Sequence, residues 1–152
     1  MQWVTREHAM VDRIACPWLI RRFIDPSAEF VYVAAREVDE VVRSTGAIPF
    51  DVPGAELHHL TEGDVTYVTF DALLRKYRLA DPALLELAHI VRQADGGTSD
   101  ANEGPGLKAA AIGFRAIARD DHENQQLQFP LYDALYAYCQ GKVGGRPPTR
   151  GA

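Results

Sequence analysis

The chain has 152 residues, the usual size of one domain, so its length excludes two well-developed hydrophobic cores. Apolar residues make up 47% and charged residues 24%, which excludes a wholly disordered or low-complexity chain. Sixteen Lys and Arg against 21 Asp and Glu give a formal net charge of −5, so we expect no nucleic-acid binding by this chain alone.

The sequence contains no run of about 18 to 20 apolar residues, the length that a membrane-spanning helix needs. The first thirteen residues lack the basic flank and apolar stretch of a secretory signal. Only two cysteines, Cys16 and Cys139, are present, which does not resemble the dense pairing of small secreted domains. We therefore expect a cytoplasmic protein without membrane insertion and without a disulfide.

The first third of the chain alternates between strand and helix patterns. Apolar residues at Ile14, Trp18 and Phe23 have helical spacing. Pro17 has no backbone N–H, so the helix should either begin near this residue or bend there. The pattern predicts a βαβαβ unit with parallel strands. Its predicted elements are a strand at 3–5, a helix at 12–25, a strand at 29–34, a helix at 36–44 and an extended segment at 48–52.

The remaining two thirds are mostly helical. Turn residues at 61–64 predict a hairpin between residues 56–60 and 65–68. The fold class is therefore α+β, with a small N-terminal βαβαβ-like sheet and a mostly helical C-terminal half. We expect one domain over residues 1–140 and a disordered tail over 141–152. The predicted helices are 69–77, 82–94, 106–119 and 131–139.

The candidate metal ligands are histidines and aspartates from three separated segments. No phosphate-binding loop, dinucleotide fingerprint or zinc-protease motif is present, so no nucleotide cofactor is expected. Carboxylates combined with imidazoles are usual ligands of iron, manganese or zinc. Adjacent histidines in an extended segment point to opposite faces, so only one of His58 and His59 should point inward. The candidate ligands are His8, Asp12, His59, Asp121 and His122. The alternative is that these are surface, hydrogen-bonded or helix-capping residues, and His89 within the 82–94 helix is an ordinary, partly buried histidine.

Basic residues and a thiol gather in the first helix. The guanidinium groups of Arg13 and Arg22 suit a tetrahedral oxyanion. The alternative to oxyanion binding is that these arginines pair with nearby carboxylates or lie on an exposed helix face. Cys16, next to a helix start, is the candidate catalytic residue, because such a position favours the thiolate. It could equally be a buried core thiol.

These residues resemble a known family. The run HAMVDRIACPWLIRRFID from His8 to Asp25, FDVPG at 50–54, His59, DDH at 120–122 and YDALY at 132–136 are similar to the C-terminal domain of ChrB-type chromate resistance proteins. The resemblance covers about residues 3 to 140. It places the family's polar motif residues at His8, Asp12, Arg13, Arg22, Asp51, His59, Asp121 and His122.

The resemblance implies a role in tolerating chromate, as a sensor or as an accessory factor for an efflux transporter. In two-part members an additional N-terminal half is associated with transcriptional regulation, and this chain begins almost directly at the shared domain, so we do not expect a DNA-binding regulator. The first hypothesis is a domain that binds an oxyanion, a metal ion or both. The alternative is a metal-dependent redox enzyme, with iron or manganese, acting on reactive oxygen species or chromate. A structural role with a homodimer formed through the aromatic C-terminal helix also stays open.

Overall fold

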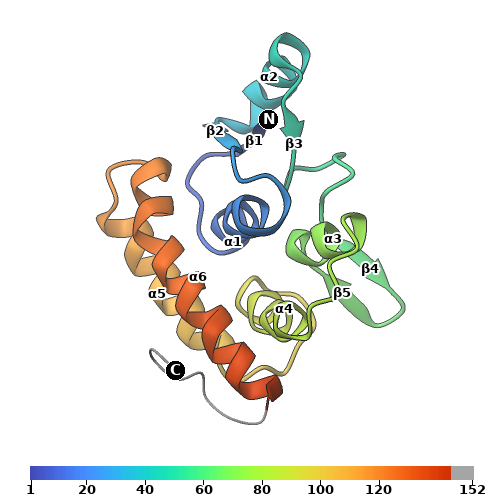
Figure 1. Cartoon of the computed structure of the whole chain (residues 1–152). Helices are drawn as coiled ribbons and strands as arrows, with labels where there is room; N and C mark the ends of the chain where they lie inside the picture. The colour runs from blue at the N-terminus through green and yellow to red at the C-terminus, as the bar shows by residue number, and fades with distance from the viewer. Residues whose placement is uncertain (145–152) are drawn as a thin grey trace.

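A computed structural model describes residues 1–144; the predicted tail residues 145–152 lie outside the described part. In chain order, strands and helices alternate at first, and helices follow (Figure 1). The elements are β1 (Gln2–Arg6), α1 (Asp12–Leu19), a π-helical turn η1 (Ile20–Ile24), β2 (Glu29–Val33), a 3-10 turn η2 (Ala35–Glu37), α2 (Val38–Thr45), β3 (Ile48–Pro49), β4 (Leu60–Glu62), β5 (Val65–Tyr67), α3 (Thr69–Lys76), α4 (Pro82–Ala94), α5 (Gly104–Ile117) and α6 (Asp121–Gly144).

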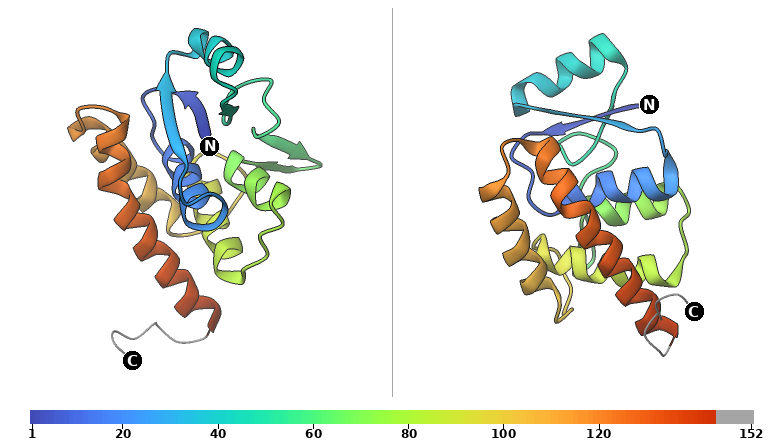
Figure 2. Two further views of the ribbon diagram at one scale, coloured as in Figure 1. Left: turned by 45° about the horizontal axis from the view of Figure 1, so that its top comes forward. Right: turned by 60° about the vertical axis from the view of Figure 1, so that its left-hand side comes forward.

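The N-terminal sheet has three parallel strands in the order β2-β1-β3, which confirms the predicted βαβαβ unit and the α+β class. Alternation along β1 sends Val4 to one face and Trp3 to the other. Val4 packs with Val38 of α2 in a small cluster, whereas Trp3 belongs to the main core with α1 and the later helices. Helix α2 and helix α1 therefore lie on opposite faces of the sheet (Figure 2).

Helix α1 begins at Asp12 and runs through Pro17 without ending there. Because Pro17 has no N–H, the carbonyl of Arg13 is left without its helical partner. The hydroxyl of Tyr32 donates to this carbonyl at 3.0 Å, so a side chain from β2 replaces the missing bond. The helix then widens into η1, where the N–H of Asp25 donates to the carbonyl of Ile20.

Helix α6 begins at Asp121, ten residues before the predicted start of the last helix at 131. Residues 121–130 are mostly polar, so they show no apolar periodicity. Their buried side chains, Asn124, Gln125 and Gln128, form hydrogen bonds with a loop and with β2 instead of joining an apolar core. The helix continues to Gly144, so residues 141–144, expected to open the tail, are helical.

The β4–β5 hairpin pairs Leu60–Glu62 with Val65–Tyr67, and its first strand starts later than the predicted 56–60 segment. Residues 51–59 form turns and bends, with one isolated bridge between Phe50 and Leu57. His58 and His59 therefore belong to an irregular segment. Over residues 1–144, none of the helices has both the length and the apolar character of a bilayer span.

Candidate metal centre

Three carboxylates converge on one imidazole. The Nε2 atom of His59 lies 3.2 Å from Asp95 Oδ2, 3.3 Å from Asp51 Oδ1 and 3.6 Å from Asp12 Oδ2. These residues come from four places: the start of α1, the segment after β3, the segment before β4 and the end of α4. One ligand atom each from Asp12, His59 and Asp95 lie within 4.8 Å of one another, a spacing at which one cation can contact all three.

Asp12 is held in place by a neighbouring helix. Its carboxylate accepts the N–H of Thr69 at 2.8 Å and of Phe70 at 3.2 Å, the first two residues of α3. The thiol of Cys16 donates to the same carboxylate at 3.2 Å. Asp12 thus satisfies two otherwise unpaired N–H groups at the start of α3, although it belongs to α1. Because Asp12 is 1% exposed, these contacts fix its orientation.

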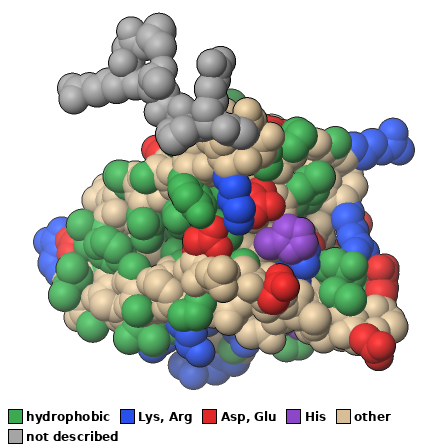
Figure 3. Space-filling view, turned by 90° about the horizontal axis from the view of Figure 1, so that it is seen from below, with side chains coloured by type: hydrophobic (Ala, Val, Ile, Leu, Met, Phe, Trp, Pro, Cys, Tyr) green, Lys and Arg blue, Asp and Glu red, His purple; other side chains and the backbone are tan. Residues whose placement is uncertain are grey.

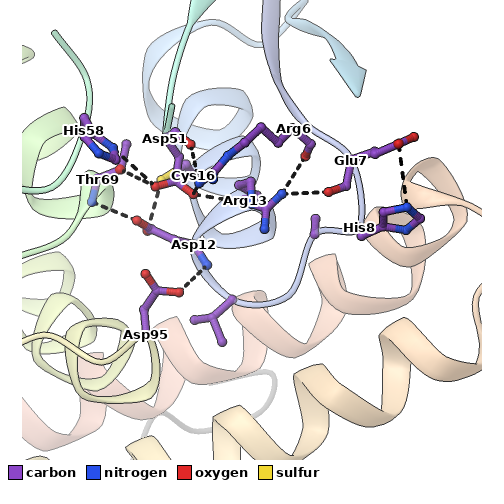
Figure 4. Close-up of polar contacts among 12 residues, drawn as sticks. Arg6, Glu7, His8, Asp12, Arg13, Cys16, Asp51, His58, Thr69 and Asp95 are labelled. Atoms are coloured by element: carbon purple, nitrogen blue, oxygen red, sulfur yellow. Dashed lines mark hydrogen bonds and ion pairs between the residues drawn. The ribbon is translucent and has the colours of Figure 1, made fainter. Parts of the chain in front are cut away.

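Asp51 and Asp95 are also anchored. Asp51 has a left-handed backbone (φ 52°) and accepts the hydroxyl of Thr69 at 2.9 Å. Its other carboxylate oxygen lies 3.4 Å from Nε of Arg13. Asp95 Oδ1 accepts the N–H of Asp12 at 3.4 Å, which leaves Oδ2 directed at His59. In Figure 4, Asp12 and Asp51 lie together with Thr69 and Cys16, and Asp95 approaches from the end of α4.

The electrostatics of this cluster favour a cation. Burial raises the pKa of Asp12 to about 7, and the nearby Asp95 and Asp51 add to the rise against the opposing hydrogen bond of His59. Hydrogen bonds to Asp12, Asp51 and Asp95 raise the pKa of His59 to about 12. Burial also acts to raise the pKa of Asp51, but its hydrogen bonds with His59 and Thr69 leave that pKa lowered. The protonated imidazole is thus the positive charge at the centre. A divalent cation can take the place of its proton, which leaves the imidazole nitrogen and the carboxylates as a donor set that fits a metal.

The structure brings Asp12 and His59 together and places the other predicted ligands elsewhere. The side chain of His8 is 80% exposed and lies 3.7 Å from Glu7. The carboxylate of Asp121 accepts the backbone N–H groups of His8 and Ala9, at 3.0 and 2.7 Å. His122 packs edge-on against the ring of Tyr32. In this structure none of these three residues contacts the Asp12–His59–Asp95 group.

The candidate anion-binding and catalytic residues are engaged in contacts within the protein. Arg13 donates to the carbonyls of Arg6 and Glu7 and lies beside Asp51, as Figure 4 shows. Arg22 pairs with Asp133 through two hydrogen bonds of 3.0 and 2.9 Å.

Cys16 is fully buried, and burial, followed by the charges of Asp12 and Asp51, holds the pKa of its thiol well above the ordinary value. The thiol therefore stays protonated at neutral pH, unlike the low-pKa thiols of reactive cysteines.

Sequence reasoning did not include Asp51 and Asp95 among the ligands. Asp51 was named only as a family motif residue. Asp95 stands at the start of a polar, glycine-containing segment whose composition is typical of a loop without a binding role. Its position directly after α4 is the signal that was available, because a carboxylate at a helix end has a fixed direction once the helix is packed.

Comparison with known proteins identifies the family. The family model described as "ChrB, C-terminal domain" matches residues 3–139. The chain belongs to this family. It is 38% identical over 141 residues to "Protein ChrB" of Cupriavidus metallidurans (strain CH34), an alignment that covers 90% of this chain and 40% of that protein. The chain thus spans less than half of this ChrB relative, and no solved structure matches it.

In this ChrB C-terminal domain, α6 positions the loop that leads into Asp12. Besides Asp121, the side chains of Asn124, Gln128 and Tyr132 contact the carbonyls of Ala9, Met10 and Val11. Asp121→Ala removes two charge-assisted hydrogen bonds and should lower the free energy of unfolding by about 1 to 3 kcal/mol. It should also lower the affinity of the Asp12–His59–Asp95 group for Mn²⁺ added as a probe, because Asp12 follows this loop directly. Urea unfolding and metal titration measure both effects, and unchanged values would show that the loop does not depend on Asp121.

A second polar region lies between α4, the segment before α5 and α6, where a groove of about 660 Å³ is lined by residues including His89, Asp100 and Lys142. His89 is exposed instead of partly buried, because it lies on the outer side of α4. Lys142 is paired with Glu86 and Glu103 at 2.6 and 3.3 Å. Figure 3 shows acidic and basic side chains gathered near a histidine on the lower face of the molecule. Three residues of this groove are thus already joined by ion pairs.

Proposed function

We propose that this domain binds a divalent metal ion through Asp12, His59 and Asp95, with Asp51 alongside, and acts in chromate resistance as a metal-dependent sensor or accessory factor. The observation that carries the proposal is the convergence of three ligand atoms, from Asp12, His59 and Asp95, within 4.8 Å of one another. The link to chromate rests on the family to which the chain belongs. The chain matches 40% of the longer relative, so a role of the whole relative comes to this chain only as part of the proposal.

The geometry supports a metal ion better than an oxyanion. Three carboxylates surround the imidazole, and they repel a tetrahedral anion. Arg13 and Arg22 are the guanidinium groups that would attract an anion, and both are occupied by acceptors within the protein. An anion would have to displace these acceptors, whereas a cation gains the carboxylates directly.

The donor set indicates the class of metal. Carboxylate oxygens with a single imidazole suit Mn²⁺ and Fe²⁺, while thiolate-rich sets select zinc and copper(I). Cys16 is the one thiol near the cluster, and its hydrogen bond with Asp12 orients a ligand. We therefore propose Mn²⁺ or Fe²⁺ as the resident ion, with Zn²⁺ as a competitor.

Metal titration tests the proposal. The chain should be stripped with a chelator, dialysed and titrated with Mn²⁺ by calorimetry, with metal content measured by mass spectrometry. We expect close to one ion per chain in the wild type and none in His59→Ala, which removes the ligand on which the three carboxylates converge.

His89→Ala is the matched control, since this exposed histidine lies in the separate groove on α4. It should bind Mn²⁺ like the wild type. A wild type that binds no divalent cation, or a His59→Ala variant that binds normally, would contradict the proposal.

The same ligands suit the alternative function, a metal-dependent redox enzyme. Asp12, His59 and Asp95 supply three ligand atoms, which leaves coordination positions for a small substrate, and 36% of the His59 side chain is exposed to solvent. Superoxide consumption by the manganese-loaded and iron-loaded protein tests this function. Metal binding without turnover supports the sensor or accessory role.

A further inference from the structure

We propose that His58 determines the metal selectivity of this centre: it supplies a second imidazole when the bound cation prefers nitrogen ligands and stays outside when the cation prefers oxygen. The inference rests on the proposed metal function and extends it, because it assigns the residue that decides which divalent cation is retained.

The two adjacent histidines lie on the same side of the chain. The rings of His58 and His59 are stacked, with centroids 5.1 Å apart and an interplanar angle of 23°. The expectation that they point to opposite faces was wrong, because the segment bends at His58 instead of continuing as a strand. The second imidazole is therefore next to the one that already faces the carboxylates.

The Nδ1 atom of His58 is directed at the cluster and has no partner. It lies 3.9 Å from Asp51 Oδ1, beyond hydrogen-bond distance. The atom is buried although 30% of the side chain is exposed, and it is among five buried side-chain polar atoms without a hydrogen-bond partner in residues 1–144. Buried polar atoms are usually satisfied, and this nitrogen, which faces Asp51, is free to bind a cation held by the cluster.

His58 Nδ1 lies only 3.9 Å from Asp51 Oδ1, so a small adjustment of the ring relative to Asp51 would let a cation contact both atoms. His58 belongs to the 51–59 segment, whose turns and bends are tied to the sheet by the bridge between Phe50 and Leu57. The same segment carries Asp51 and His59, so His58 is next to two side chains of the cluster in the chain as well as in space. Imidazole suits Ni²⁺, Cu²⁺ and Zn²⁺, whereas carboxylate and water suit Mn²⁺. The first group gains from His58, and Mn²⁺ does not.

Calorimetric titration with two cations tests the inference. Wild type and His58→Ala, both stripped of metal, should be titrated with Ni²⁺ and with Mn²⁺. We expect His58→Ala to weaken Ni²⁺ binding by about tenfold or more and to change Mn²⁺ binding by less than about threefold. His122→Ala, which removes a histidine away from the cluster, should leave both affinities unchanged.

A spectroscopic count of imidazoles provides a second readout, which does not depend on measured affinities. Pulsed electron paramagnetic resonance of the Cu²⁺-loaded wild type should detect two coordinated imidazoles, and the His58→Ala protein should show one. A single imidazole in the wild type, equal losses for Ni²⁺ and Mn²⁺, or no loss for either would overturn the role of His58. Failure of the wild type to bind any of these cations would instead remove the metal function itself, and this inference with it.

Discussion

Asp71→Ala should lower the free energy of unfolding by about 3 to 5 kcal/mol, because it leaves a buried arginine without its counter-charge. Asp71 is 5% exposed and Arg92 is 8% exposed. Arg92 donates to both carboxylate oxygens of Asp71, from Nε at 3.1 Å and from Nη2 at 2.7 Å. Asp71 also accepts the N–H of Val68 at the start of α3, so the substitution removes a helix cap as well.

Urea unfolding followed by circular dichroism measures this effect. Glu40→Ala is the control, because it breaks the Arg43–Glu40 pair, whose side chains are 74% and 68% exposed. The control should change the free energy of unfolding by no more than about 0.5 kcal/mol. A loss below about 1 kcal/mol in Asp71→Ala would show that Arg92 finds another partner or reaches solvent.

The position of this pair also explains how the centre is built. Asp71 and Arg92 join α3 to α4, and α3 begins where α4 ends, beside the candidate centre: the first N–H groups of α3 hold Asp12, and Asp95 follows α4. The packing of α3 against α4 therefore sets the distance between two of the ligands. Residues outside the centre determine whether its carboxylates meet.

The fold could be predicted where apolar periodicity carries the structure. Helix α4 has the predicted bounds, because Asp81 caps it, Pro82 starts it and apolar residues repeat along it. Helix α6 was predicted only in its second half. In its first turns the buried side chains of Asn124 and Gln128 donate to backbone carbonyls. Because these buried residues are polar, the sequence shows no apolar periodicity there.

Only part of the centre was predicted, for a related reason. Asp12 and His59 stand in motifs and were named as ligands, whereas Asp95 lies in a segment with the composition of a loop. Asp121 and His8 are residue types that bind metals, but the carboxylate of Asp121 accepts hydrogen bonds from the backbone N–H groups of His8 and Ala9. Spacing along a sequence indicates which residues can bind a metal, and only the packing of the helices determines which of them meet.

Asp95→Asn should separate metal binding from folding. The variant keeps a carbonyl oxygen for the N–H of Asp12 and loses the negative charge that faces His59. Metal affinity should fall by about a hundredfold or more, because removing a unit charge from contact with a dication costs several kcal/mol. The metal-free protein should keep its stability to within about 1 kcal/mol, since the substitution also relieves repulsion between Asp95 and the buried Asp12.

Thermal unfolding with and without Mn²⁺ distinguishes the two effects in one experiment. At a free metal concentration one hundred times the dissociation constant, the wild type should gain about 2.7 kcal/mol, and Asp95→Asn at the same concentration should gain little. Asp100→Asn, an exposed residue of the neighbouring segment, should respond to Mn²⁺ like the wild type. Equal stabilisation of Asp95→Asn and wild type would show that Asp95 is not a ligand. A metal-free Asp95→Asn protein that is strongly destabilised would show that the carboxylate of Asp95 serves the fold, as the counter-charge of a protonated His59.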